Sequence, residues 1–213
     1  MMTPIPTPIY RLVHVDNLDT ILRRGGMHGT NHVPNDGLPY RTIHNVDIQN
    51  ERHRRCIACG PGGTMHDYIP FYFGYLSPML LQLKTNRVMG YTEGQQPLIY
   101  LVSTAQSVAG ECGFVFSNGH GIAAFTEWFD DLSRLNEVDW NMVYQRYWSD
   151  GIQDMDRQRR KQAEFLVHRF FPWTRITMIG VMNSKAKAHV DAILDGFDAS
   201  LKRSVNVRGA WYY

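Results

Sequence analysis

The sequence is poor in cysteine, with only three among 213 residues. A small, odd number of cysteines does not form a disulfide framework and fits a reducing compartment. Long apolar runs are missing too, since none approaches the roughly 20 residues that a membrane-spanning helix needs. The first residues are polar and rich in proline, unlike a secretory signal peptide. We therefore expect a cytoplasmic protein without a membrane partner.

Neither sign of charge is in excess, because 22 Lys and Arg residues oppose 20 Asp and Glu residues, for a formal net charge of +2. A nucleic-acid function must then depend on local basic clusters. Apolar residues make up 44% of the chain and aromatic residues 12%, enough for a substantial core. No repeat or linker divides the chain, so we predict a single domain over residues 1–213.

Several enzyme motifs are absent. The chain has no Gly-x-x-x-x-Gly-Lys phosphate loop, no Gly-x-Gly-x-x-Gly after a strand, no Gly-x-Ser-x-Gly and no His-Glu-x-x-His. His53, Cys56 and Cys59 have ligand-like spacing, with His66 downstream. No second ligand pair follows at the spacing of a zinc finger, so we interpret the cysteines as reduced loop residues and predict no metal.

The order of secondary structure elements predicts a mixed α+β fold. Stretches rich in β-branched and aromatic residues predict strands at 9–15, 67–73, 98–103, 113–117, 176–182 and 205–213. Amphipathic patterns and capping residues, including Ser77 and Ser184, predict helices at 16–24, 77–85, 122–135 and 184–197. The irregular spacing argues against a repeated strand, helix, strand unit. Residues 26–66 and 130–162 contain much charge, and such long excursions are usually functional or disordered.

Two stretches carry chemistry-bearing residues. In "RQRRKQAEFLVHRFFPW", residues 157–173, the lone carboxylate of Glu164 lies where a basic run meets an apolar one. Such a run can steer nucleic-acid phosphates, although it can equally form a solvated helix face. Its cations are Arg157, Arg159, Arg160 and Lys161. In "YRLVHVDNLDTILRRGG", His14 ends an apolar strand, where it can hold a ligand hydroxyl or serve as a structural histidine.

Together with "HDYIPFYFGYLSPML" and "RKQAEFLV", that first stretch resembles the DarT family, the toxins of DarT–DarG toxin–antitoxin pairs. The resemblance runs from Ile9 to the terminal "AWYY". It implies an NAD-dependent transferase that moves ADP-ribose to a base, thymine, in single-stranded DNA in a sequence-dependent way. It also implies a fold similar to poly(ADP-ribose) polymerases, with a split central β-sheet and surrounding helices, and a DarG-type macrodomain antitoxin as partner.

The resemblance further implies roles for individual residues. His14 is similar to a strand histidine at the nicotinamide-side ribose, and Asn17 follows it at the helix start. Tyr72, in "PFYF", resembles the aromatic residue that stacks on nicotinamide. Arg52, in "NERHRR", resembles the essential arginine, and Glu164 the catalytic glutamate.

Other assignments leave alternatives open. Arg54 and Arg55 compete with Arg52, whose planar guanidinium can pair with the NAD pyrophosphate. Met79 can line the nicotinamide or base pocket, or be a core residue. His120, on a turn flanked by glycines, can contact a flipped base or be a plain loop histidine.

On this interpretation residues 26–66 form a lid over NAD and residues 120–163 recognise the DNA. Two other functions remain open. One is a nucleic-acid-binding module without catalysis, using the basic clusters at 52–55 and 157–161. The other is an ADP-ribosyltransferase acting on protein or RNA.

Overall fold

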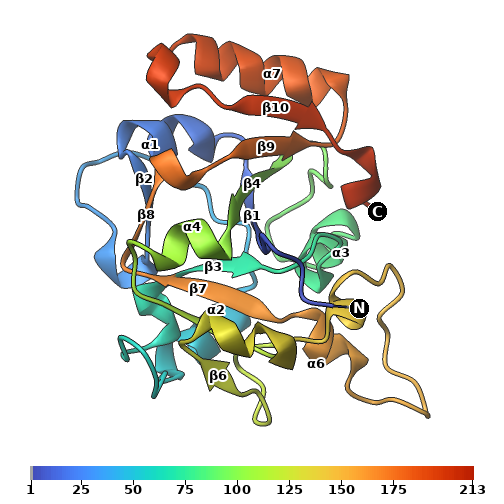
Figure 1. Ribbon diagram of the computed structural model, residues 1–213. Coiled ribbons are helices and arrows are strands. Elements are labelled where there is room, and N and C mark those ends of the chain that lie inside the picture. The colour runs from blue at the N-terminus through green and yellow to red at the C-terminus, as the bar shows by residue number, and fades with distance from the viewer. Residues whose placement is uncertain (1) are drawn as a thin grey trace.

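The computed structural model describes residues 2–213 and is built on a central sheet (Figure 1). The sheet has eight strands in the order β10-β9-β4-β1-β3-β7-β5-β6, and all neighbours are antiparallel except the parallel pair β9 and β10. Its strands are β1 (Pro8–His14), β3 (Tyr68–Tyr72), β4 (Leu98–Thr104), β5 (Phe114–Ser117), β6 (Trp128–Phe129), β7 (Glu164–His168), β9 (Met178–Val181) and β10 (Ser204–Val207). A separate two-stranded sheet pairs β2 (Gly26–His28) with β8 (Phe170–Pro172).

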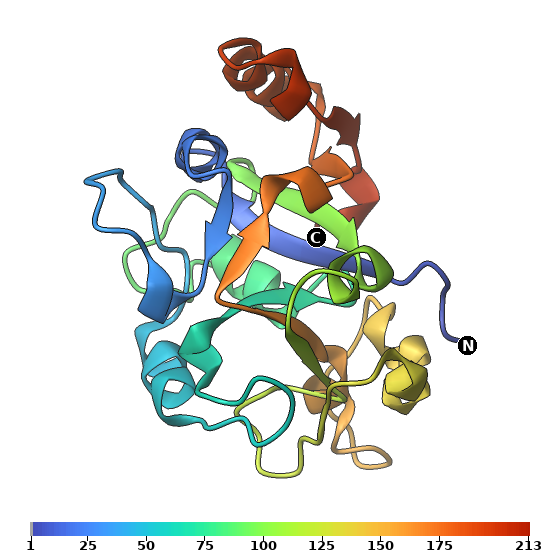
Figure 2. The same cartoon turned by 60° about the vertical axis from the view of Figure 1, so that its left-hand side comes forward.

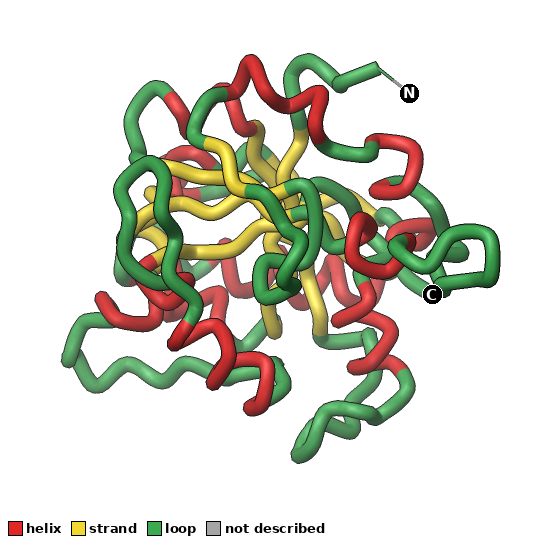
Figure 3. The backbone as a smooth tube through the Cα atoms, turned by 90° about the horizontal axis from the view of Figure 1, so that it is seen from below, coloured by secondary structure: helices red, strands yellow, loops and turns green. Residues whose placement is uncertain are grey.

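The helices are short. The α-helices are α1 (Asn17–Arg23), α2 (Val46–Arg54), α3 (Pro78–Lys84), α4 (Ala105–Ala109), α5 (Trp140–Val143), α6 (Arg157–Lys161) and α7 (Ser184–Asp195). The 3-10 helices are η1 (Thr30–His32), η2 (Met65–Asp67), η3 (Leu132–Glu137), η4 (Trp173–Arg175), η5 (Ala199–Leu201) and η6 (Gly209–Trp211). Figure 3 shows the strands gathered in the middle with helices and long loops around them. The mixed α+β prediction is therefore confirmed.

The sheet is split between β1 and β3. β1 pairs with β4 over seven residues, from Pro8 to His14, but with β3 only where Tyr10 faces Tyr72. On the other side of the split, β3 pairs with β7 over the five residues Tyr68–Tyr72. The two halves of the sheet therefore separate beyond Tyr10, which confirms the expected split sheet.

The two faces of the sheet differ in what they bury. One face carries alternate apolar residues such as Val13, Phe71 and Phe165, packed against residues of α1, α4, α5 and α7 in the main core. The other face carries Tyr10, Tyr72 and Glu164, since facing partners in a ladder lie on the same side. Over β1 and β4, α3 covers this second face.

The helix starts follow capping chemistry. The Ser77 hydroxyl accepts a hydrogen bond from the Leu80 amide at the start of α3, as predicted. At α7 the cap is Asn183, one residue before the predicted Ser184. The helix predicted at 122–135 is wrong: this stretch forms a turn, β6 and the start of η3. Phe129 instead pairs with Phe116 across the sheet, where their rings stack 5.1 Å apart.

The C-terminal residues leave the sheet earlier than predicted. Only Ser204–Val207 of the expected strand at 205–213 pairs with β9. Trp211 stacks on Tyr75 at 5.3 Å, and the Tyr212 hydroxyl donates to the Leu98 carbonyl at 2.9 Å. The closing aromatic residues therefore pack across the α3-covered face, and this packing replaces further strand pairing.

Three further findings concern residues 2–213. No helix there is long and apolar enough to span a membrane. No group of three or more His, Cys, Asp or Glu residues in this range could hold a metal ion. The three cysteines are free thiols.

The excursion at 26–66 is joined to the sheet through Asp67. Figure 2 shows the blue and cyan loops of this segment along one side of the sheet. The Asp67 carboxylate accepts hydrogen bonds from the Thr64 amide at 2.7 Å and from Asn31 at 3.0 Å, and lies 3.1 Å from His32. Burial raises the Asp67 pKa, but these hydrogen bonds outweigh it and lower the pKa to about 2.

This lowered pKa predicts an acid-dependent loss of stability. Because the folded pKa lies below that of an ordinary aspartate, the contribution is complete above the ordinary pKa and is lost as pH falls through about 2. We expect Asp67→Asn to lower the free energy of unfolding by roughly 2 kcal/mol at neutral pH and to flatten its fall in acid. Urea unfolding at several pH values measures both, and Asn31→Ala should remove part of the effect. Wild-type pH dependence in Asp67→Asn would contradict this account.

Candidate active site

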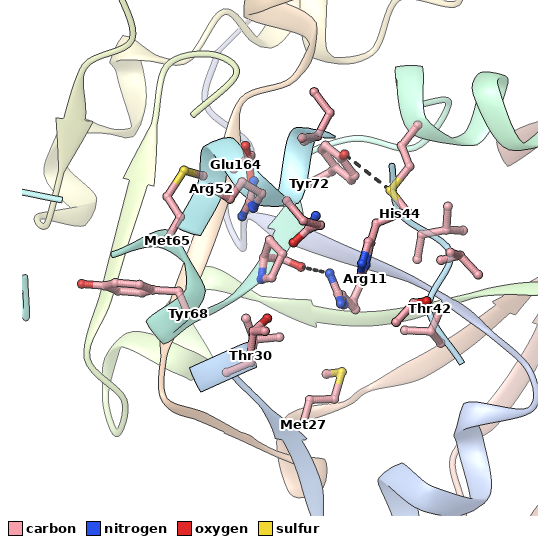
Figure 4. Close-up of a pocket in the computed structure, with 18 of the residues that line it drawn as sticks. Arg11, Met27, Thr30, Thr42, His44, Arg52, Met65, Tyr68, Tyr72 and Glu164 are labelled. Carbon is pink, nitrogen blue, oxygen red and sulfur yellow. Dashed lines mark hydrogen bonds and ion pairs between the residues drawn. The ribbon is translucent and has the colours of Figure 1, made fainter. Parts of the chain in front are cut away.

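A cavity of about 430 Å³ lies where β1 and β3 separate (Figure 4). Most of its lining residues come from β1, α1, β2, the loop at 33–45, α2, β3 and α3, and Glu164 is contributed by β7. Much of the excursion at 26–66 therefore faces the cavity. A pocket of this size, with polar groups placed among apolar ones, is typical of a small-molecule site.

An ion pair lies at one end of this cavity. Arg52 Nη1 is 2.8 Å from Glu164 Oε2, and the side chains are only 8% and 3% exposed. The second oxygen, Glu164 Oε1, accepts a hydrogen bond from the Gly121 amide at 3.1 Å. Arg52 Nη2 is buried without a hydrogen-bond partner among the described residues. The carboxylate is thus held in place from two sides, while one nitrogen of the arginine remains for a ligand.

The position of Arg52 follows from local sequence. Asn45 caps α2 by accepting hydrogen bonds from the amides of Asp47 and Ile48. Arg52 is the buried residue of this helix, and it pairs with Glu164 of β7. Arg54 is exposed, and Arg55 donates to the Ala123 carbonyl at 3.2 Å. Since neither lines the cavity, the geometry favours Arg52 over its two neighbours.

Tyr72 and Met79 also line the cavity. Tyr72 lies opposite Glu164 in the ladder, and its hydroxyl is 3.9 Å from the Met79 sulfur. Burial raises the pKa of Tyr72, and the charge of Glu164 raises it further. The phenol is therefore neutral at physiological pH and presents an uncharged ring beside the ion pair.

His120 lies in the same cavity, on the turn after β5. Its backbone is fixed, because the amide donates to the Arg159 carbonyl at 2.9 Å and the carbonyl accepts from the Thr126 hydroxyl at 2.7 Å. Burial lowers the pKa of His120, Glu164 opposes this, and Arg52 adds to it. A neutral imidazole, able to donate and accept, is therefore expected there.

Asn17 and His14 lie in different places. Asn17 lines the cavity, and its side-chain amide exchanges two hydrogen bonds with the Arg41 backbone, at 2.8 and 2.6 Å. His14 is 1% exposed and is not among the residues that line this cavity. Its ring lies 3.2 Å from Asp16 and 3.4 Å from Glu93, beside a second cavity of about 830 Å³.

The basic run is largely engaged within the protein. Arg159 pairs with Asp156 at 2.7 Å, and Arg160 pairs with Asp139 and Asp154. These arginines therefore hold the loops around α6 together.

Lys161 differs most from expectation. It is 3% exposed, and its ammonium donates to the carbonyls of Val143 at 2.6 Å, Gln145 at 2.7 Å and Tyr75 at 3.4 Å. Burial lowers the Lys161 pKa to about 8. A phosphate cannot reach this group as it lies here, so Lys161 is corrected to a structural residue. Arg157 makes no ion pair among residues 2–213, and it donates to the Tyr147 carbonyl at 2.8 Å.

Comparisons with known proteins decide the family. The family model described as "ssDNA thymidine ADP-ribosyltransferase, DarT" matches residues 10–213. The chain belongs to the DarT family. The DNA ADP-ribosyl transferase of Thermus sp. (strain 2.9) is 39% identical over 212 residues, which cover 99% of this chain and 98% of that protein.

Solved structures of the same family agree. Thermus sp. 2.9 DarT in complex with ADP-ribosylated ssDNA matches with a TM-score of 0.92 and 37% identity, covering 100% of this chain and 99% of that one. Thermus sp. 2.9 DarT in complex with NAD+ matches with a TM-score of 0.88 and 37% identity, covering 100% of both chains. The resemblance noted from the sequence motifs is therefore confirmed.

Sequence reasoning missed several groups around this DarT cavity. The loop at 33–45 contributes Arg41, which pairs with Asp16 and Glu93 and binds Asn17. Gly121 donates to Glu164, although no residue type marks a backbone donor in a sequence. Arg11 had a visible signal, since a charged residue within the apolar stretch "IYRLVHV" breaks its pattern.

The structural role of Lys161 predicts a stability effect. Lys161→Met keeps most of the side-chain volume but leaves three carbonyl acceptors without their donor. We expect a loss of roughly 2 to 4 kcal/mol in the free energy of unfolding, measured in urea. Lys185→Met, at an exposed position of α7, is the matched control and should change it by less than about 0.5 kcal/mol. Equal stability of the two variants would restore Lys161 as a candidate phosphate contact.

Proposed function

We propose that Arg52 and Glu164 form the catalytic pair with which this DNA ADP-ribosyltransferase moves ADP-ribose from NAD to thymine in single-stranded DNA. The observation that carries this proposal is the buried 2.8 Å ion pair at the end of a cavity that Tyr72 also lines. Among the residues that line this cavity, Glu164 is the sole carboxylate. We therefore assign the catalytic carboxylate to Glu164.

One acid is enough for the chemistry. The bond between nicotinamide and ribose C1′ breaks, and the ribose passes through a cation-like transition state, as in glycoside cleavage. Nicotinamide leaves as a neutral molecule and needs no general acid. The new bond forms between a thymine ring nitrogen and C1′, and the proton of that nitrogen has to be accepted. Glu164 can stabilise the cation and accept this proton.

The other cavity residues suit the co-substrate. The neutral Tyr72 ring can stack on nicotinamide, with Met79 beside it, and Asn17 also lines the cavity. Arg52 fixes the Glu164 carboxylate, and its free Nη2 can donate to a ribose oxygen. The excursion at 26–66, which supplies much of the cavity lining, would act as the lid over NAD.

DNA would approach from the segment at 120–163. His120 lies beside the ion pair, where its imidazole can hydrogen-bond an extruded base. Arg157 is the member of the basic run that can still contact a phosphate, because Arg159 and Arg160 are paired with aspartates. Selectivity for a DNA sequence would arise from the loops of this segment.

The cellular role follows from the family. We infer a toxin that acts in the cytoplasm, where NAD and DNA meet, and that is countered by a DarG-type macrodomain antitoxin. A macrodomain partner would remove ADP-ribose from the modified base. A catalytic role for Glu164 also distinguishes the proposed function from that of a nucleic-acid-binding module without catalysis, because such a module does not need this carboxylate.

Replacing Glu164 tests the proposal. The residue acts on charge that develops in the transition state, so its loss should damage rate much more than binding. We expect Glu164→Gln to retain the fold and most NAD affinity while losing at least about 100-fold in transfer to a thymine-containing oligonucleotide. Glu164→Ala should behave alike, since neither side chain offers charge or basicity. Glu137→Gln, at an exposed carboxylate of η3, is the control.

The readouts separate the alternatives. Mass spectrometry of oligonucleotides, RNA and total protein after incubation with NAD identifies the acceptor. A purely structural acid would give variants with lowered melting temperature and NAD affinity, but with normal transfer per folded molecule. Full transfer by Glu164→Ala would end the assignment of this residue as catalytic.

A further inference from the structure

Arg11 occupies the split in the sheet. It follows Tyr10, the last β1 residue that faces β3, and its Nη1 reaches across to the Pro70 carbonyl of β3 at 3.1 Å. Figure 4 shows its side chain among those that line the cavity, with a dashed line for this hydrogen bond. Arg11 thus brings a guanidinium to the cavity from β1, on one side of the split. Glu164 comes from β7, which pairs with β3 on the other side.

This guanidinium lacks a counter-charge. Among residues 2–213, Arg11 makes no ion pair, and its Nε is buried without a hydrogen-bond partner. The other arginines that line the cavity are each paired with a carboxylate: Arg24 with Asp36, Arg41 with Asp16, and Arg52 with Glu164. Arg11 is therefore the lining arginine whose charge the described fold leaves unbalanced.

The charge balance of the cavity favours an anion. Four arginines and one carboxylate, Glu164, line it; Asp36 and Asp16, outside the lining, balance Arg24 and Arg41, which leaves Arg11 as the unbalanced charge. Arg11 as a whole is half-buried, but its Nε is a buried donor without a partner, and such donors are rare in native proteins. Burial is the main cause that lowers the pKa of the neighbouring His44, and the charge of Arg11 lowers it further. The charges of His66 and Arg52 act on the pKa of His44 in the same direction.

We propose that Arg11 binds the pyrophosphate of NAD. The pyrophosphate is the anionic part of this dinucleotide, and a planar guanidinium can donate to two of its oxygens at once. Sequence analysis suggested Arg52 for this role, but Arg52 is engaged by Glu164 at the end where the ribose must react. The inference rests on the proposed function, because it places the reactive ribose at Glu164 and the phosphates nearer the split.

Ligand dissection tests the inference. Calorimetry should show Arg11→Gln binding NAD and ADP-ribose about 10- to 100-fold more weakly than wild type, the range expected for hydrogen bonds to a charged group. Adenosine and nicotinamide, which lack the pyrophosphate, should bind with unchanged affinity. Arg11→Lys keeps the charge and should recover part of the loss. Raising the salt concentration should weaken NAD binding less in Arg11→Gln than in wild type.

The design includes a matched control and four decisive outcomes. Arg134→Gln, at an exposed arginine paired with Glu137, should bind every ligand as wild type does. Wild-type NAD affinity in Arg11→Gln overturns the inference. So does an equal loss for all four ligands with a lowered melting temperature, which would make Arg11 a structural bridge across the split. If Arg11→Gln does not fold, Arg11→Lys decides, since unchanged NAD and ADP-ribose affinity there would also count against a bidentate contact. Failure of the wild type to bind NAD would instead reject the proposed function.

Discussion

The ion pair between Arg52 and Glu164 is the interaction on which the active site depends. It joins α2, in the long excursion before β3, to the first residue of β7. Removing two charges from water is expensive, and the pair persists because Gly121 satisfies the second carboxylate oxygen. One arginine nitrogen still lacks a partner. A pair held this way fixes the acid for reaction and contributes little to net stability.

The split sheet supplies the space that this pair needs. Where β1 and β3 stop pairing, the backbone leaves a cavity between the two halves of the sheet. Tyr72 and Glu164 lie on the cavity face because they are partners in the adjacent ladder. The opposite face of the same strands is filled by the main core. The strands thus hold reactive groups on one face and provide rigidity through the other.

Local signals in the sequence predicted six of the ten strands among residues 2–213, the capped helix at Ser77 and the single acid at Glu164, but not β7, the strand that carries Glu164. They failed where tertiary packing decided the outcome. The sequence pattern assigned Phe129 to an amphipathic helix at 122–135. In the structure Phe129 lies in β6, where its ring stacks on that of Phe116. The sequence pattern predicted Lys161 to be an exposed cation of a basic run. The carbonyls that bind its ammonium belong to residues distant in sequence, so no local pattern could show its burial. His14 ends its strand as predicted, and only the fold shows that its ring lies outside the lining of the main cavity.

In the proposed reaction, NAD cleavage at this cavity is coupled to bond formation on a thymine ring nitrogen. The most direct test is to measure nicotinamide release and oligonucleotide mass in one reaction of the wild-type protein with NAD. The proposed mechanism predicts one nicotinamide released for each ADP-ribose gained by a single-stranded oligonucleotide containing thymine. It predicts neither product when the thymine ring nitrogen that carries a hydrogen is blocked by a methyl group. Equal labelling of the blocked oligonucleotide, or nicotinamide release without any gain in mass, would contradict it.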